Sequence, residues 1–241
     1  MVIGVVHTLM GDMSNDEVRL VEQRYDRRAL SGVDSRYSLL IDDALLTAQE
    51  KERALVKWLR YARLDPARCR LLEIGCGAGN NLIELLRLGF DPSHLAGVEL
   101  LADRTVLARN RLPEATPIIH GDALSVDLPD APFDVVFQST VFTSILDRRY
   151  QQQLADRMWA CIHPGGGVLW YDFMYDNPAN LDVRGVSVSR IRELFPSSHM
   201  KSWRLTLAPP ISRMVTRIHP ALYQFCNIPL LRTHILCWIP K

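Results

Sequence analysis

The sequence predicts an α/β fold in which a doubly wound, mostly parallel sheet follows a helical N-terminal segment. From residue 70 onward, short apolar segments alternate with amphipathic segments at the pitch expected of successive strand and helix units. The glycine-rich stretch LLEIGCGAGN, at 71–80, joins the first of these strands to the helix that follows it. The chain of 241 residues is long enough to bury one large core, and we expect one domain.

Each element is expected from its own pattern of apolar residues. Apolar residues at helical spacing, with charges between them, predict two leading helices at 15–30 and 40–61. Short apolar segments bounded by turn residues predict seven strands, at 70–75, 94–100, 116–122, 133–140, 166–173, 202–209 and 234–240. Helical patterns predict the helices between and after them, at 80–89, 103–112, 147–162, 190–196 and 212–226. Asp103 is expected to cap the second of these helices, and Gly89 to end the first.

Composition excludes several function classes. A formal net charge of +1 gives no general attraction for polyanions, so no nucleic-acid partner is expected. The five cysteines are dispersed without a C-x-x-C pair, which favours reduced thiols in a cytoplasmic protein. No set of His, Cys or carboxylate residues has metal-ligand spacing, so no metal is expected. No apolar run approaches the length of a membrane span.

The glycine turn indicates a ligand site. In open parallel sheets the ligand lies at the carboxyl ends of the strands, and glycine lets it touch the backbone beside a helix N-terminus. The glycines are Gly75, Gly77 and Gly79, a G-x-G-x-G spacing rather than the G-x-G-x-x-G of dinucleotide sites. Glu73 lies just ahead of them. A carboxylate there would repel a pyrophosphate but suits an ammonium or sulfonium group.

The motif EIGCGAG resembles that of the class I S-adenosylmethionine-dependent methyltransferases, and the order of motifs resembles this family over 65–175. The resemblance implies a Rossmann-like, seven-stranded, mostly parallel sheet of order 3-2-1-4-5-7-6 with an antiparallel last strand. It also implies a helical lid at 1–62, a methyltransferase core at 63–241, and S-adenosylmethionine as the cofactor. The final strand, helix and strand of the tail fit this sheet order.

The resemblance further implies roles for individual residues. Glu99 would hold the ribose hydroxyls, Asp122 would approach the adenine amino group, and the end of the fourth strand would lie beside the methionine part. Cys76 is expected to contribute only backbone, and Tyr25, Arg36 and Tyr37 are expected to contact the cofactor from the lid. The full set expected to bind the cofactor is Glu73, Gly75, Cys76, Gly77, Gly79, Asn80, Glu99, Leu100, Asp122, Ala123, Gln138, Ser139, Tyr25, Arg36 and Tyr37.

Two residues are candidates for a general base, which an alcohol acceptor would require. Asp172 lies near the carboxyl end of the fifth strand, and His234 begins the antiparallel strand that returns to the same edge. We favour Asp172, because strand ends hold side chains rigidly. The expected acceptor contacts are Thr140, Phe142, Tyr171, Phe173, Arg184, Arg213 and Arg232. Arginines around one cleft suit a carboxylate or phosphate, but solvated surface arginines are an equal alternative.

The leading function is methyl transfer to an oxygen of a small molecule, such as a sugar, a glycolipid or a secondary metabolite. Transfer to nitrogen, to protein or to RNA is an alternative, although no NPPY-like loop follows the fourth strand, where QSTVFTS stands. A nicotinamide-dependent oxidoreductase is a third class. The expected partner is a small acceptor molecule, and the protein is expected to be a monomer or a homodimer.

Overall fold

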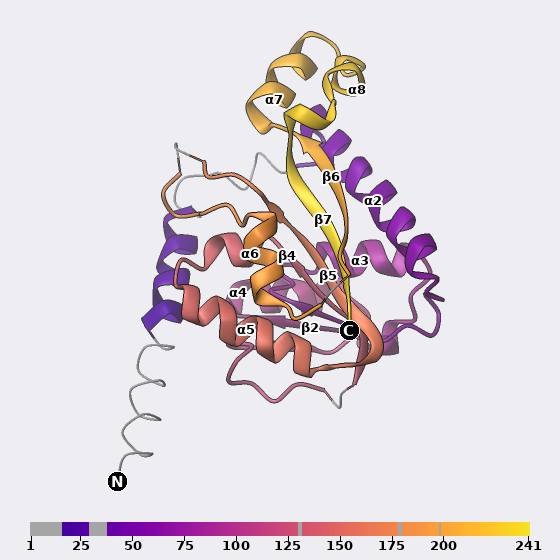
Figure 1. Ribbon diagram of the computed structural model, residues 1–241, viewed down its shortest axis with the longest axis vertical. Helices are drawn as coiled ribbons and strands as arrows, with labels where there is room; N and C mark the ends of the chain where they lie inside the picture. The colour runs from indigo at the N-terminus through magenta and orange to yellow at the C-terminus, as the bar shows by residue number, and fades with distance from the viewer. Residues whose placement is uncertain (1–15, 29–37, 130–131, 178–179, 198) are drawn as a thin grey trace.

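The computed structural model describes residues 16–28, 38–129, 132–177, 180–197 and 199–241. Seven strands form one sheet in the order β3-β2-β1-β4-β5-β7-β6, with helices on both faces (Figure 1). The strand β7 runs antiparallel to both of its neighbours, while the other pairings are parallel. The predicted fold class, strand order and antiparallel last strand are therefore confirmed.

The strands β1 and β2 are short and buried on both faces. Every residue of β1 and of β2 is buried, as expected of parallel strands that helices cover from both sides. The seven strands are β1 (Leu71–Ile74), β2 (Leu95–Glu99), β3 (Ile118–His120), β4 (Phe133–Ser139), β5 (Ile162–Phe173), β6 (Lys201–Leu207) and β7 (Arg232–Pro240).

The helices follow the sequence prediction with two differences. The described elements are a helix at 16–28, then α2 (Asp42–Ala62), α3 (Asn80–Arg87), η2 (Pro92–His94), α4 (Ala102–Arg111), η3 (Phe142–Ser144), α5 (Arg148–Ala160), α6 (Val188–Leu194), α7 (Pro209–Ile218), α8 (Leu222–Cys226) and η4 (Pro229–Leu231). Leu101 rather than Asp103 is the N-cap of α4, so Asp103 lies in the first turn. The single helix expected at 212–226 is two, because His219 precedes Pro220 and adopts the extended conformation that this position favours.

Alternate residues of each strand feed two core layers. In β5, Val168 and Trp170 pack toward α5 and α6, whereas Leu169 and Tyr171 pack toward α2, α3 and α4. Trp58 of α2 and Trp170 are both fully buried. Truncation of such a side chain costs about 3–5 kcal/mol, so the face of α2 that carries Trp58 belongs to the core.

The segment between β6 and β7 forms a projection at one end of the molecule, made of α7, α8 and η4 (Figure 1). A small third core of Leu207, Val215 and Tyr223 holds it together. The Tyr223 hydroxyl donates to Glu50 Oε2 at 2.8 Å, which ties the projection to α2.

Candidate active site

The glycine turn is fixed against β2 and leaves open space in front of one glycine. The amides of Gly75 and Cys76 both donate to the Val98 carbonyl, at 2.8 and 3.0 Å. A Cβ atom on Gly75 would lie 2.5 Å from a Val141 methyl carbon, whereas one on Gly77 would meet no atom within 4 Å. Both glycines have positive φ, +67° and +58°. The backbone at Gly77 therefore faces open space, where a ligand could touch it.

The carboxylate at the end of β2 is held against this turn. Glu99 is buried, and its two oxygens accept from the amides of Gly77 at 2.7 Å and Leu101 at 2.9 Å. Cys76 is buried beside Gly97 in the core, consistent with a backbone contribution only. Leu100 follows Glu99 and packs partly buried against the core. The predicted neighbours Glu99 and Gly77 are thus in direct contact.

The carboxylate of Glu73 is fully buried and only half satisfied. Its Oε1 accepts from Asn81 Nδ2 at 2.5 Å, whereas Oε2 has no hydrogen-bond partner among the described residues. Burial raises the pKa of Glu73 to about 7. A buried acceptor without a donor costs free energy, so this oxygen faces the position where a cationic or hydrogen-bond-donating ligand is needed.

A lysine that sequence reasoning missed completes this cluster. The Lys51 ammonium donates to Asn81 Oδ1 at 2.5 Å and to Ser139 Oγ at 3.2 Å, and lies 4.7 Å from the centroid of the Tyr171 ring. Burial lowers the pKa of Lys51. Its position in the sequence could have indicated it. Lys51 lies four residues before the buried Leu55, on the same face of α2, where an apolar residue is expected.

Asn81, not the predicted Asn80, faces Glu73. Asn80 lies on the surface, where its Oδ1 accepts from the Arg111 guanidinium at 2.7 Å. Asn80 and Asn81 begin the same helix, one residue apart, and consecutive helical residues point about 100° apart. The sequence marked the helix start, but it did not show which asparagine turns toward β1.

The loop after β3 is ordered by Asp122. The carboxylate accepts from the Leu124 amide at 3.0 Å and the Ser125 hydroxyl at 3.0 Å, and the Tyr150 hydroxyl of α5 also donates to it. Ala123 is buried next to it. The two residues expected near an adenine therefore lie in one fixed loop at the carboxyl edge of the sheet.

The end of β4 makes a strained turn. Thr140 has φ +59°, which is unusual for a β-branched residue and marks a conformation that the surroundings enforce. Gln138 is fully buried and braces the turn, since its Nε2 donates to the Tyr171 carbonyl at 3.4 Å and its Oε1 accepts from the Val141 amide at 3.1 Å. Gln138 thus braces β4 against β5, while Ser139 presents its hydroxyl to Lys51.

Both candidate bases are buried at the same edge, in different surroundings. Asp172 Oδ1 accepts from the Thr143 hydroxyl at 2.8 Å and the Phe173 amide at 2.9 Å, and Oδ2 accepts from the Thr143 amide at 3.2 Å. Burial raises the pKa of Asp172 to about 7, against the effect of these donors. The carboxylate therefore fastens η3 to β5.

His234 lies between aromatic rings. Its ring is stacked on Tyr171 at a centroid distance of 5.2 Å and tilted against Phe173 at 4.0 Å. Burial lowers the pKa of His234 to about 3, and the Lys51 charge adds to this shift. The imidazole is therefore neutral at physiological pH.

The other predicted acceptor contacts do not gather around one cleft. Phe142 is fully buried against Trp170, at a centroid distance of 4.5 Å, and packs the core. Arg184 is exposed, Arg213 lies 3.9 Å from Asp43, and the Arg232 guanidinium donates to Asn227 Oδ1 at 2.9 Å. These contacts with different elements favour the alternative reading, that the three arginines are surface and structural charges.

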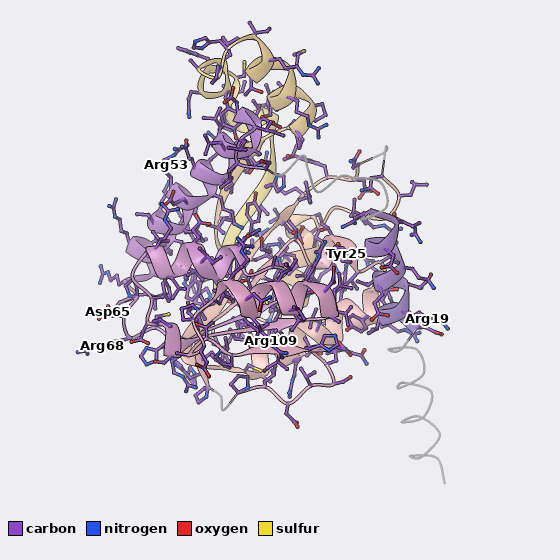
Figure 2. All side chains as sticks on the ribbon, turned by 180° about the vertical axis from the view of Figure 1, so that it is seen from behind. Arg19, Tyr25, Arg53, Asp65, Arg68 and Arg109 are labelled. Carbon is purple, nitrogen blue, oxygen red and sulfur yellow. The ribbon has the colours of Figure 1, made fainter. Side chains whose placement is uncertain are left out.

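The helix at 16–28 lies across the edge that carries the site. Arg24 and Glu17 form a buried ion pair at 2.8 Å, Arg24 donates to the Ser144 carbonyl, and Glu17 accepts from the Leu146 amide. The Tyr25 hydroxyl lies 3.3 Å from Ser144 Oγ. Figure 2 shows Tyr25 directed inward from this helix. Arg36 and Tyr37, also predicted to contact a cofactor, lie outside the described residues.

The described part of the chain contains no candidate metal site and no helix that could cross a bilayer. Within it, no group of three or more His, Cys, Asp or Glu side chains is placed to hold a metal ion. Among its helices, none combines the length and the apolar character that crossing a bilayer requires. The five cysteines are free thiols.

Comparison with known proteins identifies the family. The family model of a methyltransferase domain matches residues 71–166, which include the glycine turn, Glu99 and Asp122. The trans-aconitate 2-methyltransferase of Afipia carboxidovorans is 30% identical over 162 residues, covering 67% of this chain and 57% of that protein. The chain belongs to the class I S-adenosylmethionine-dependent methyltransferases.

Further similarities agree with this assignment. The fatty-acid O-methyltransferase of Mycolicibacterium smegmatis is 33% identical over 120 residues, which are 48% of this chain and 42% of that one. A structure of a putative sarcosine dimethylglycine methyltransferase from Galdieria sulphuraria superposes with a TM-score of 0.62 at 12% identity, over 82% of this chain and 88% of that one. That likeness shows the fold. The chain spans little more than half the length of the curated relative it matches over the longest stretch.

The site residues fit S-adenosylmethionine, the cofactor of the family. Gly77 faces open space, and the carboxylate of Glu99 is held beside it. The unpartnered Glu73 oxygen is a buried acceptor, and it suits the cationic amino-acid part of such a ligand. The glycine turn and its two carboxylates therefore agree with the family assignment.

Proposed function

We propose that this methyltransferase transfers a methyl group to an oxygen atom of a small molecule. The observation that carries the proposal is the neutral His234 imidazole enclosed by Tyr171 and Phe173 at the carboxyl edge of β5 and β7. Aromatic walls bind the apolar body of a small acceptor, and a neutral imidazole accepts a hydrogen bond from its hydroxyl. The name of one relative, the fatty-acid O-methyltransferase, supports an oxygen acceptor.

In this proposal the residues around the glycine turn hold the cofactor. Glu99 would hold the ribose hydroxyls, Asp122 and Ala123 would meet the adenine, and Glu73 with Lys51 and Ser139 would hold the amino-acid part. When bound, S-adenosylmethionine supplies a methyl group on a sulfonium sulfur, so the leaving group needs no further activation. The protein's contribution is then mainly positioning.

The acceptor side supplies orientation and a place for one proton. The acceptor hydroxyl would donate a hydrogen bond to the neutral His234 imidazole, and its proton would pass to this imidazole only as the oxygen bonds to the methyl carbon and the bond from that carbon to the sulfonium sulfur breaks. Asp172 acts as a positioning residue, because its donors Thr143 and Phe173 fix η3 and the end of β5. The helix at 16–28 acts as the lid, since the buried pair of Arg24 and Glu17 docks it on the segment after β4. Exclusion of water by this lid would strengthen each of these polar contacts.

Titration calorimetry with S-adenosylmethionine tests the cofactor site. Glu99→Ala should weaken binding by about 1.5–3 kcal/mol, because a charged acceptor of two hydrogen bonds is lost. Exposed Glu114→Ala is the matched control and should bind as the wild type does. Wild-type affinity in Glu99→Ala would contradict the ribose assignment.

The acceptor atom is identified separately. The protein is incubated with S-adenosylmethionine carrying a carbon-13 methyl group and with pools of small hydroxy and carboxylic acids. The carbon chemical shift of the labelled product distinguishes a methyl on oxygen from one on nitrogen. Label found on nitrogen, or only on added RNA or protein, would contradict the proposed acceptor while leaving the cofactor site intact.

A further inference from the structure

The projection made of α7, α8 and η4 carries an apolar surface that the methyl-transfer site does not use. Its most exposed large apolar side chains are Ile218, Phe225 and Leu230, which are 74%, 79% and 82% exposed, and Met214 and Ile228 are also exposed. They lie on three short elements that stand away from the sheet (Figure 1). Such a concentration of exposed apolar side chains marks an interaction surface.

The charged side chains of the projection itself are positive. Residues 208–231 contain two arginines, Arg213 and Arg217, and no aspartate or glutamate. On α7 each of two exposed arginines is followed by an exposed apolar residue: Met214 follows Arg213, and Ile218 follows Arg217. The acids nearby belong to α2. Asp42 and Asp43 lie in its first turn, Asp43 is 3.9 Å from Arg213, and Glu50 accepts from the Tyr223 hydroxyl. Apolar side chains flanked by arginines are typical of helices that lie in a bilayer interface.

A basic hollow adjoins the apolar surface. It has a volume of about 410 Å³ and lies between α2 and β6, with Pro229 of η4 at its border. Its lining includes four cationic side chains and one acidic side chain, which are Arg53, Lys57, Arg204, Arg232 and Glu50. Figure 2 shows Arg53 on the outer side of α2, about midway along the helix. A hollow of this charge fits the phosphate of a lipid headgroup.

We propose that the projection docks this methyltransferase onto the surface of an anionic lipid bilayer. Ile218, Phe225 and Leu230 enter the boundary between headgroups and acyl chains, and the arginines of α7 keep their charged ends at headgroup level. The basic hollow takes an anionic headgroup beside η4. Docking of this kind is independent of which molecule accepts the methyl group.

A second copy of the chain is a poorer occupant of this surface. In a two-fold contact the same surface meets itself, so Arg213 and Arg217 of one copy would face the cations of the other. An anionic bilayer instead neutralises these charges while it covers the apolar side chains. Charge and apolar area therefore agree for a bilayer and conflict for a dimer.

Docking also orients the site. The projection follows the carboxyl end of β6 and precedes β7, in which His234 is the third residue. The edge of the sheet that carries Asp172 and His234 therefore lies on the side of the molecule from which the projection extends. The same edge would face the bilayer.

Sedimentation with vesicles tests the proposal on the full chain. The wild type should sediment with equimolar phosphatidylcholine and phosphatidylglycerol vesicles and much less with phosphatidylcholine alone. Phe225→Ser with Leu230→Ser should lower the partition coefficient at least tenfold, roughly the loss expected on removing two inserted side chains. The matched control, Val106→Ser with Leu107→Ser on α4, removes two side chains that are 54% and 50% exposed and should sediment as the wild type does.

The hollow is tested by charge removal. Arg53→Gln with Lys57→Gln should weaken sedimentation with the anionic vesicles and should reduce its dependence on salt. Thermal unfolding should be unchanged in all these variants, because the substituted side chains are exposed. Equal sedimentation of the wild type and the Phe225, Leu230 variant would overturn the proposal. The proposal would also be overturned if the wild type were a dimer in sedimentation equilibrium, the Phe225, Leu230 variant were a monomer, and neither bound vesicles.

Discussion

The edge of the sheet at β1 and β2 and the edge at β5 and β7 are assembled by different kinds of contact. At the first, Glu99 is held by Gly77 and Leu101, and Glu73 by Asn81, and the two members of each bonded pair are at most 22 residues apart in the chain. At the second, Asp172 depends on Thr143, 29 residues away, and the Tyr171 ring of β5 stacks on His234 of β7. A local motif therefore builds the cofactor side, whereas tertiary packing builds the acceptor side.

The largest expected effect tests whether the cofactor side is as local as this comparison implies. Gly77→Val places a side chain in the open space before the turn, and it should weaken S-adenosylmethionine binding by more than ~100-fold because ligand and side chain cannot share the space. Calorimetric titration measures the loss.

The matched control is Gly165→Val. Gly165 also has a positive φ, +97°, and a Cβ atom added to it would meet no atom within 4 Å. Unlike Gly77, it lies near the amino end of β5, away from the glycine turn. Both variants should lose similar stability, about 1–2 kcal/mol, because a side chain is strained at positive φ. If both variants lost cofactor binding equally, the loss would come from strain and not from occupied space.

The same difference explains what the sequence could predict. The alternation of strands and helices and the glycine turn follow from local patterns, and the resemblance to the family adds the strand order, Glu99 and Asp122. The structure places the glycine turn, Glu99 and Asp122 together at one edge. Lys51 could not be placed from the sequence, because only the packing of α2 on the sheet turns its ammonium toward Ser139. Phe142 was misplaced for the same reason, since its burial against Trp170 depends on η3 folding back on β5.

The second expected effect separates the two buried groups of the acceptor side. His234→Ala should lower kcat by ~10²-fold with little change in cofactor affinity, because the proton acceptor is lost. Asp172→Asn should instead lower thermal stability together with kcat, since it replaces a carboxylate that accepts three hydrogen bonds.

The pH profile sharpens this test. With the pKa of His234 at about 3, protonation of this residue should not lower kcat as pH falls through the neutral range, contrary to a histidine with an ordinary pKa. A fall that is present in the wild type and absent in Asp172→Asn would instead report Asp172, whose pKa burial raises to about 7. Near-normal kcat in both variants would show that the acceptor oxygen is already ionised and that positioning alone supports transfer.

A smaller effect tests the charge of the cofactor side. The pKa of Glu73 is raised to about 7 by burial, so the carboxyl is neutral at lower pH and ionised at higher pH. Because the ionised form attracts a cationic ligand, S-adenosylmethionine affinity should rise by up to about tenfold from pH 6 to pH 8. Glu73→Gln should abolish this rise. The control is Glu84→Gln, which removes another carboxyl of raised pKa, on α3 one turn after Asn81. This variant should keep the rise in affinity.

The smallest effect belongs to the opposite edge of the sheet, where His163 begins β5. Its Nε2 lies 2.8 Å from Asp134 Oδ1, and this hydrogen bond raises the pKa of His163, aided by the Pro164 carbonyl. A pKa that is higher in the folded state gives stability that is complete below about pH 6.5 and is lost as pH rises through the folded value. Because both side chains are about one-third exposed, the contribution should not exceed about 1 kcal/mol. Urea unfolding of the wild type and His163→Gln should therefore differ at pH 6 and converge at pH 9, while cofactor affinity stays equal. A change of cofactor affinity in His163→Gln would show that the amino ends of the strands are coupled to the site at their carboxyl ends. The site would then not depend only on the contacts at the carboxyl ends.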